Sequence, residues 1–147
     1  MKETERSLRW YLLLAGVIAA LTAMRDIDSL KSYGGVLTTG QMAALYIPIV
    51  TRLLLGAAFV VAGVKLPSAL LTGAGWIKTM LVISGAALLL DGAIVTAVFG
   101  GAGQSGIVGA AVGIAITAYL HHSVTRLAAE AAIKASLAAP LPQSRVV

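Results

Sequence analysis

The stretch MLVISGAALLLDGAIVTAVFG, residues 80–100, is an almost continuous apolar run of 21 residues that contains a single carboxylate, Asp91. An α-helix needs roughly 20 apolar residues to cross the hydrocarbon core of a bilayer, and this stretch has that length. A charged side chain at the centre of such a helix costs about 2.5–3.5 kcal/mol on insertion scales. The stretch therefore predicts a membrane-spanning helix. Because of this cost, Asp91 is expected to have a partner, and the partner bears on function.

The composition of the whole chain is that of a membrane protein. Of its 147 residues, 59% are hydrophobic and 12% are charged, against about 45–50% and about 25% in soluble domains. One small core cannot hide this excess, because a soluble domain of this size needs a polar exterior. We therefore expect an all-α integral membrane protein whose residues 1–147 form a single membrane domain.

Four segments have the length and the apolar character of spanning helices, and they predict a compact four-helix bundle. The expected helices cover about residues 8–24, 43–64, 76–99 and 104–139, the last with a cytoplasmic part, followed by a flexible tail over 140–147. Pro48 either lies within the second helix or marks its first turn, and Pro67 marks an expected tight turn over 65–75. The N-terminus resembles a signal peptide but lacks an A-x-A site, so we expect it to be retained as the first span.

The distribution of Lys and Arg predicts that both termini are cytoplasmic. Two basic residues, Arg25 and Lys31, would then lie outside, and eight would lie inside: Lys2, Arg6, Arg9, Lys65, Lys78, Arg126, Lys134 and Arg145. This asymmetry also explains the net charge of +5 without a nucleic-acid partner, which we do not expect. The expected location is the bacterial cytoplasmic (inner) membrane, with several passes.

Away from the ends of the membrane-spanning segments, Arg52 is the only basic residue and Asp91 is the only acidic one. At 1.5 Å per residue both lie roughly 12 Å below the outer surface, so we expect an intramembrane ion pair between the second and third helices. Two roles stay open: the pair fixes the register of the helices, or it lines a polar path for a permeant or a ligand. A third reading has no pair, with Arg52 extended to the surface or Asp91 carrying a proton.

Gly106, Gly109 and Gly113 are expected to line one side of the fourth helix, where the lack of side chains lets another helix approach closely. The partner is either the third helix of the same chain or another subunit.

The part of the fourth helix beyond Leu120 is expected to have a polar and an apolar side. His121 and His122 lack the ligand spacing of a metal site, so we expect interfacial histidines and no metal. A polar stripe predicts a Glu130–Lys134 pair. The opposite face, which includes Leu127, Ala131 and Ala135, is expected to lie on lipid or to bind a partner helix.

The sequence offers little for catalysis. It contains no cysteine, which excludes disulfides and thiolate sites, and it has no phosphate-binding loop, zinc-protease motif or hydrolase elbow. Asp26 and Asp28 are expected in a solvated turn, because a calcium site needs more oxygen ligands. We expect no cofactor and no enzymatic activity.

One short segment resembles a known family. Residues 52–59, RLLLGAAF, followed by Gly63 and Lys65, are similar to the first-helix pattern of DoxX-like four-helix membrane proteins. The segment falls in the second span rather than the first, and the lysine is displaced by one position, so no function is carried over from that family.

The function expected from these features is that of a small non-catalytic membrane protein. It would be a structural or accessory subunit of a membrane complex, or a homo-oligomeric scaffold, with the lipid bilayer and other membrane subunits or copies of itself as partners. The alternative is a small oligomeric transporter or channel with a polar path at Arg52 and Asp91.

Overall fold

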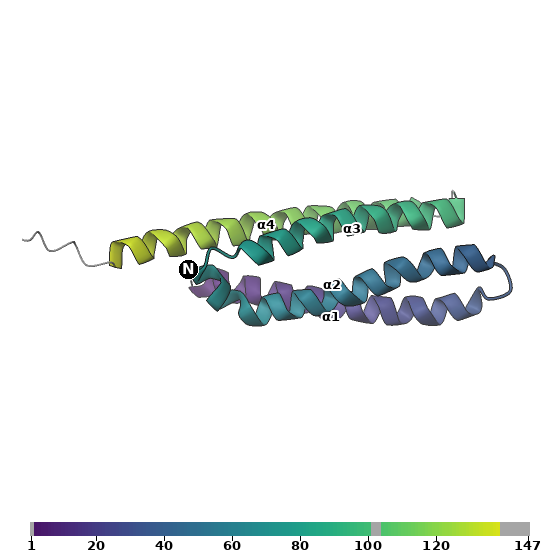
Figure 1. The fold of residues 1–147 in the computed structure, drawn as a ribbon, viewed down its shortest axis with the longest axis horizontal. Coiled ribbons are helices and arrows are strands. Elements are labelled where there is room, and N and C mark those ends of the chain that lie inside the picture. Colours follow the sequence, from purple (N-terminus) through teal and green to yellow (C-terminus); the bar gives the residue numbers. More distant parts are fainter. Residues whose placement is uncertain (1, 101–103, 139–147) are drawn as a thin grey trace, which may run out of the picture.

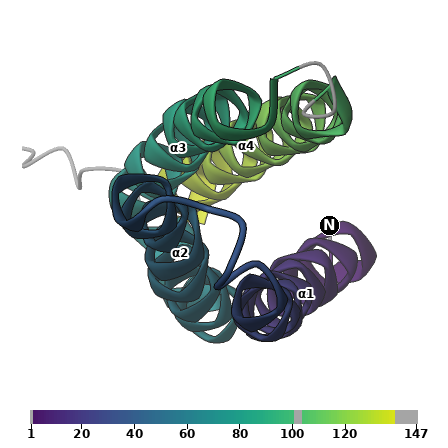
Figure 2. The ribbon, with the colours of Figure 1, turned by 90° about the vertical axis from the view of Figure 1, so that its right-hand side faces the viewer.

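The computed structural model describes residues 2–100 and 104–138, which form four α-helices (Figure 1). They are α1 (Lys2–Ser32), α2 (Thr39–Leu71), α3 (Gly75–Phe99) and α4 (Gln104–Ala138). All four are long and apolar enough to cross a membrane. Helices α1 and α2 form one antiparallel hairpin and α3 and α4 form another, with α2 and α3 adjacent (Figures 1 and 2). The all-helical fold and its four potential spans agree with the sequence prediction.

The first two helices are longer than predicted. Helix α1 continues through residues 25–32, beyond the expected end of the first helix at residue 24. Helix α2 begins at Thr39, where the Thr38 side chain accepts a hydrogen bond from the Gln41 backbone and the Gln41 side chain accepts one from the Thr38 backbone. This reciprocal cap satisfies two amide groups that a helix start otherwise leaves free. The apolar run marks only the part of a helix that lies in lipid, and the hydrogen-bonded backbone continues beyond it.

Both prolines of α2 lie inside the helix. Pro48 is buried nine residues after Thr39, so it does not mark the first turn. Pro67 was expected to mark a tight turn over 65–75, but α2 continues past it to Leu71, and the turn is confined to residues 72–74. There Gly73 has a φ of 79°, a left-handed conformation that glycine adopts without strain. The predicted tail over 140–147 lies outside the described residues.

Glycine permits a close approach of α1 and α2. A Cβ atom built on Gly16 would lie 2.6 Å from the carbonyl oxygen of Gly56, which is too close for any side chain. A Cβ on Gly63 would lie 2.8 Å from the Leu13 side chain. The two backbones therefore meet directly, as expected where lipid provides no hydrophobic force between helices.

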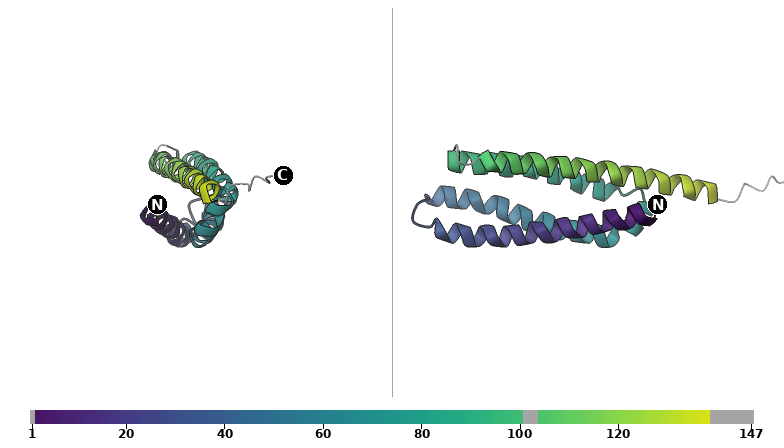
Figure 3. Two further views of the ribbon diagram at one scale, coloured as in Figure 1. Left: turned by 90° about the vertical axis from the view of Figure 1, so that its left-hand side faces the viewer. Right: turned by 180° about the vertical axis from the view of Figure 1, so that it is seen from behind.

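The two ends of the molecule are packed differently. The N-terminus and the end of α4 lie at the same end, which we call the terminal end (Figure 3). There a hydrophobic cluster draws on all four helices: Leu8, Leu12, Phe59, Ala62, Leu66, Ala69, Leu70, Ala74, Ile77, Met80, Leu81, Leu120, Val124, Leu127 and Ala128. At the opposite end the buried members of a second cluster are Ala23, Leu30, Leu45 and Ile49, and its partly buried members come from α1–α3 and the α1–α2 turn. Among the described residues, α4 adds nothing to this second cluster, and Figure 2 shows α1 and α4 apart at this end.

The predicted orientation has a direct test, because the chain has no cysteine of its own. Ser32 and Ser136 are both exposed and lie at opposite ends of the molecule. A cysteine at Ser32 should react with an impermeant thiol reagent added to intact cells. A cysteine at Ser136 should react only after the cells are permeabilised. The reverse pattern of labelling would contradict cytoplasmic termini.

Candidate functional site

Arg52 and Asp91 meet between α2 and α3. The Arg52 Nε atom lies 3.4 Å from Asp91 Oδ2. Asp91 is only 4% exposed, although it lies on a helix whose sequence is otherwise almost entirely apolar. The structure therefore brings together the two charges that the sequence places in the interior of apolar spans.

A third charged residue, Asp26 of α1, belongs to the same group. Arg52 Nη1 donates a hydrogen bond to Asp26 Oδ2, so the guanidinium contacts two carboxylates from two different helices. The expectation of a solvated turn at Asp26 is wrong, because α1 continues through this position and the residue is partly buried. We call Asp26, Arg52 and Asp91 the charge cluster.

A signal for Asp26 is present in the sequence. Ala23, Ile27 and Leu30 belong to the second hydrophobic cluster, and their spacing of three and four residues is that of one helix face. Asp26 lies on this same face. The apolar stripe thus continues beyond Met24, where the first span was expected to end. Because Asp26 lies on this stripe, its side chain faces the other helices.

The charge cluster is unevenly buried. The side chains of Asp26 and Arg52 are 31% and 28% exposed, and that of Asp91 is 5% exposed. Asp91 Oδ1 is buried and has no hydrogen-bond partner. Pairing removes much of the cost of placing a charge in a membrane. Here the single guanidinium of Arg52 pairs with two carboxylates. The arrangement can join three helices electrostatically, or it can hold a charged species.

Exposed ion pairs also lie on the helix surfaces of the described residues. Lys31 Nζ lies 2.9 Å from Asp28 Oδ1, with both side chains more than 70% exposed. Arg126 Nε lies 3.0 Å from Glu130 Oε1 on α4. Exposed pairs of this kind add little to stability, so neither is a candidate site.

The glycines of α4 face in two directions. A Cβ on Gly106 would lie 3.0 Å from the Val95 side chain, and a Cβ on Gly113 would lie 2.8 Å from that of Leu88, so both face α3. A Cβ on Gly109 would meet nothing within 4 Å. The expectation that all three glycines line one packing face is therefore wrong for Gly109 within the chain, because three residues turn a helix by roughly 300° and move Gly109 to the edge of that face. A contact from Gly109 to another subunit stays a prediction.

The expected partner face on the last part of α4 is largely used by the chain itself. Leu127 is 3% exposed and lies in the cluster at the terminal end, and Ala131 packs against that cluster. Ala135, one turn further, is exposed. Residues of α1 and α2 belong to the same cluster as Leu127, so a partner contact stays a prediction only for the exposed end of the helix.

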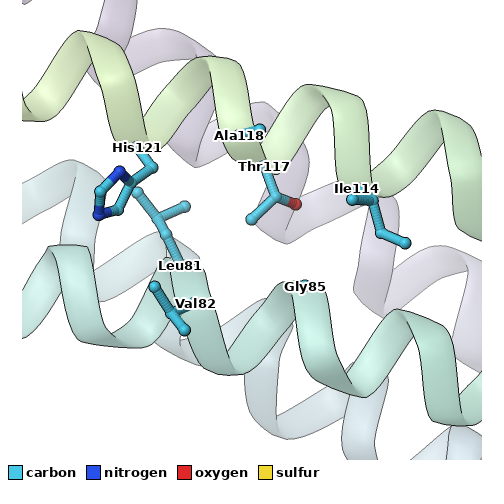
Figure 4. A pocket seen from close by; sticks show the side chains of 7 residues that line it. All are labelled: Leu81, Val82, Gly85, Ile114, Thr117, Ala118 and His121. Carbon is cyan, nitrogen blue, oxygen red and sulfur yellow. The ribbon is translucent and has the colours of Figure 1, made fainter.

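A shallow groove of about 290 Å³ lies between α3 and α4 (Figure 4). Its polar side chains are Thr117, whose hydroxyl donates to the Gly113 carbonyl at 2.7 Å, and His121. His122 is exposed. In the part of the chain that the structure describes, no group of three or more His, Cys, Asp or Glu residues is placed to hold a metal ion.

The fold and the charge cluster together define a class of protein, a multi-pass helical membrane protein with charged residues inside its helix bundle. Comparison with protein-family models, curated proteins and solved structures finds no match to this chain. Function is therefore inferred from the geometry alone.

Proposed function

We propose that the chain is a small non-catalytic membrane protein that acts as a structural or accessory subunit of a membrane complex, or as a homo-oligomeric scaffold. The observation that carries the proposal is the end of α4. This helix extends beyond the other three at the terminal end (Figures 1 and 3) and carries two exposed large apolar side chains there, Ile133 at 60% and Leu137 at 80%.

Within residues 2–100 and 104–138, no residue of α4 beyond Ala131 packs against either hydrophobic cluster. Ile133 and Leu137 are four residues apart, so they lie on one face of the helix. With the termini on the cytoplasmic side of a bacterial inner membrane, this apolar face emerges at the membrane surface. A second subunit or a second copy would cover it.

Replacing Leu137 by aspartate tests this proposal. The wild-type chain, purified in a mild detergent, should have a native mass larger than that of one chain, and Leu137→Asp should reduce it to one chain. The single chain should stay folded, because within it the side chain is 80% exposed and packs on no core residue. Ser136→Asp is the matched control, since it adds the same charge at a neighbouring position that is already polar. An unchanged mass in Leu137→Asp would mean that the extension lies on lipid, against the proposal.

A transporter or channel is the second candidate, and the charge cluster is the observation that favours it. Asp26, Arg52 and Asp91 come from three helices and meet at the level of the second hydrophobic cluster, whose members Ile27, Leu53 and Ile94 lie close to them in the chain. Intramembrane ionisable groups commonly mark ion or substrate pathways. Four helices in one copy make a poor conduit, so this function also requires an oligomer.

A further inference from the structure

The charge cluster holds one negative charge in excess. Arg52 contributes one positive charge, and Asp26 and Asp91 contribute one negative charge each. Of the basic residues near Asp26 on α1, Arg25 is exposed and Lys31 pairs with Asp28 instead. Within residues 2–100 and 104–138, Arg52 is the only basic side chain with a nitrogen within 4.0 Å of either carboxylate. The surrounding protein therefore leaves the cluster short of one positive charge.

The geometry of Asp91 points to the same deficit independently. Asp91 is 4% exposed, and its Oδ1 atom has less than 1 Å² of accessible surface and no hydrogen-bond partner. A buried carboxylate oxygen without a partner is costly, because it has lost its contact with water and gained nothing in return. Its other oxygen, Oδ2, is the one that faces Arg52.

We propose that the charge cluster binds one monovalent cation, a proton or an alkali-metal ion, at Asp91. A single positive charge makes the cluster neutral, whereas a divalent ion would leave it positive. The charged groups that face Asp91 are Asp26 from α1 and Arg52 from α2. On α4 the sequence from Gln104 to Leu120 contains no Asp, Glu, Lys, Arg or His. This site goes beyond the proposed function, because it holds whether the chain assembles, transports or does both.

The test is the dependence of stability on cations. A ligand that binds only the folded state raises stability with the logarithm of its concentration once this exceeds Kd. The melting temperature of the purified chain should therefore rise either with sodium, replacing choline at constant pH, or on acidification at constant sodium. Asp91→Asn keeps the size of the side chain and leaves the neutral Asp26–Arg52 pair. It should melt at the same temperature in all these conditions, at or above the best wild-type value.

The outcomes distinguish a bound proton from a bound alkali-metal ion. A response to sodium at constant pH that Asp91→Asn abolishes identifies a metal ion, and a response to acid alone that it abolishes identifies a proton. Asp28→Asn removes an exposed carboxylate and should keep the wild-type response. Asp26→Asn also leaves a neutral pair, so it should lose the response even if Asp91→Asn fails to fold. Equal responses of the wild type and the Asp26→Asn variant would overturn the proposal.

Discussion

Arg52→Ala should be the most damaging single change in the charge cluster, lowering the free energy of unfolding by about 3–5 kcal/mol. The change leaves Asp26 and Asp91 near one another with no positive charge between them, and Asp91 is only 4% exposed. Unfolding of the purified chain in mixed micelles, followed by the fluorescence of Trp10 and Trp76, measures the loss.

The stabilities of the related alanine variants should follow from the same count of charges. Asp91→Ala should cost only about 0.5–1.5 kcal/mol, since Arg52 keeps Asp26 as its partner. The double variant Arg52→Ala, Asp91→Ala should be more stable than Arg52→Ala alone, because one orphaned carboxylate remains rather than two. Adding Asp26→Ala should recover most of the remaining loss. If Arg52→Ala cost no more than Asp91→Ala, or if the losses in the double variant were additive, the three residues would not act as a cluster.

Function can be separated from stability with the neutral triple variant, in which Asp26, Arg52 and Asp91 are all alanine. A folded triple variant with an unchanged native mass, but without the cation flux that the wild type shows in liposomes, would favour the transporter. A folded triple variant that retains its assembly and its cellular role would make the cluster structural. Lys31→Ala is the control, because it breaks only an exposed pair and should leave the unfolding curve unchanged.

The spans were predictable from sequence and the helix ends were not. An apolar run of about 20 residues has few alternatives to a spanning helix, because lipid cannot hydrogen-bond a free backbone. Residues 25–32 and 65–71 are helical as well, yet they contain charged residues or proline and look like loops in a hydropathy pattern. The start of α2 is an exception, since the Thr38 and Gln41 capping box can be read directly from the sequence.

The charge cluster was predictable in part for a related reason. Arg52 and Asp91 are the charges in the interior of their spans, and they lie at similar depth. Their pairing follows because an unpaired charge in lipid is energetically costly. Asp26 was missed because it lies outside the apolar run of α1. The contact of Gly16 with Gly56 was also out of reach, because the chain has 16 glycines and only the relative rotation of two helices shows which ones meet.

Gly16→Leu should be the most damaging change outside the charge cluster. A Cβ at this position would lie 2.6 Å from the backbone oxygen of Gly56 and 2.7 Å from the Val60 side chain. The leucine therefore meets backbone that cannot rotate away, and α1 must separate from α2. Overpacking of a core costs about 1–3 kcal/mol, and a contact with backbone lies at the upper end of that range. The same unfolding measurement should show a loss of about 3 kcal/mol.

Gly109→Leu is the matched control, because it makes the same substitution in a potential span where a Cβ meets nothing within 4 Å. Both variants gain the same helix propensity from the loss of glycine, so the difference between their stabilities isolates the packing of α1 on α2. The Gly109→Leu monomer should be at least as stable as the wild type. If its native mass falls to that of one chain, Gly109 lies at a contact between subunits; if the mass is unchanged, this face meets lipid. Equal stabilities of Gly16→Leu and Gly109→Leu would contradict the close backbone contact between the first two helices.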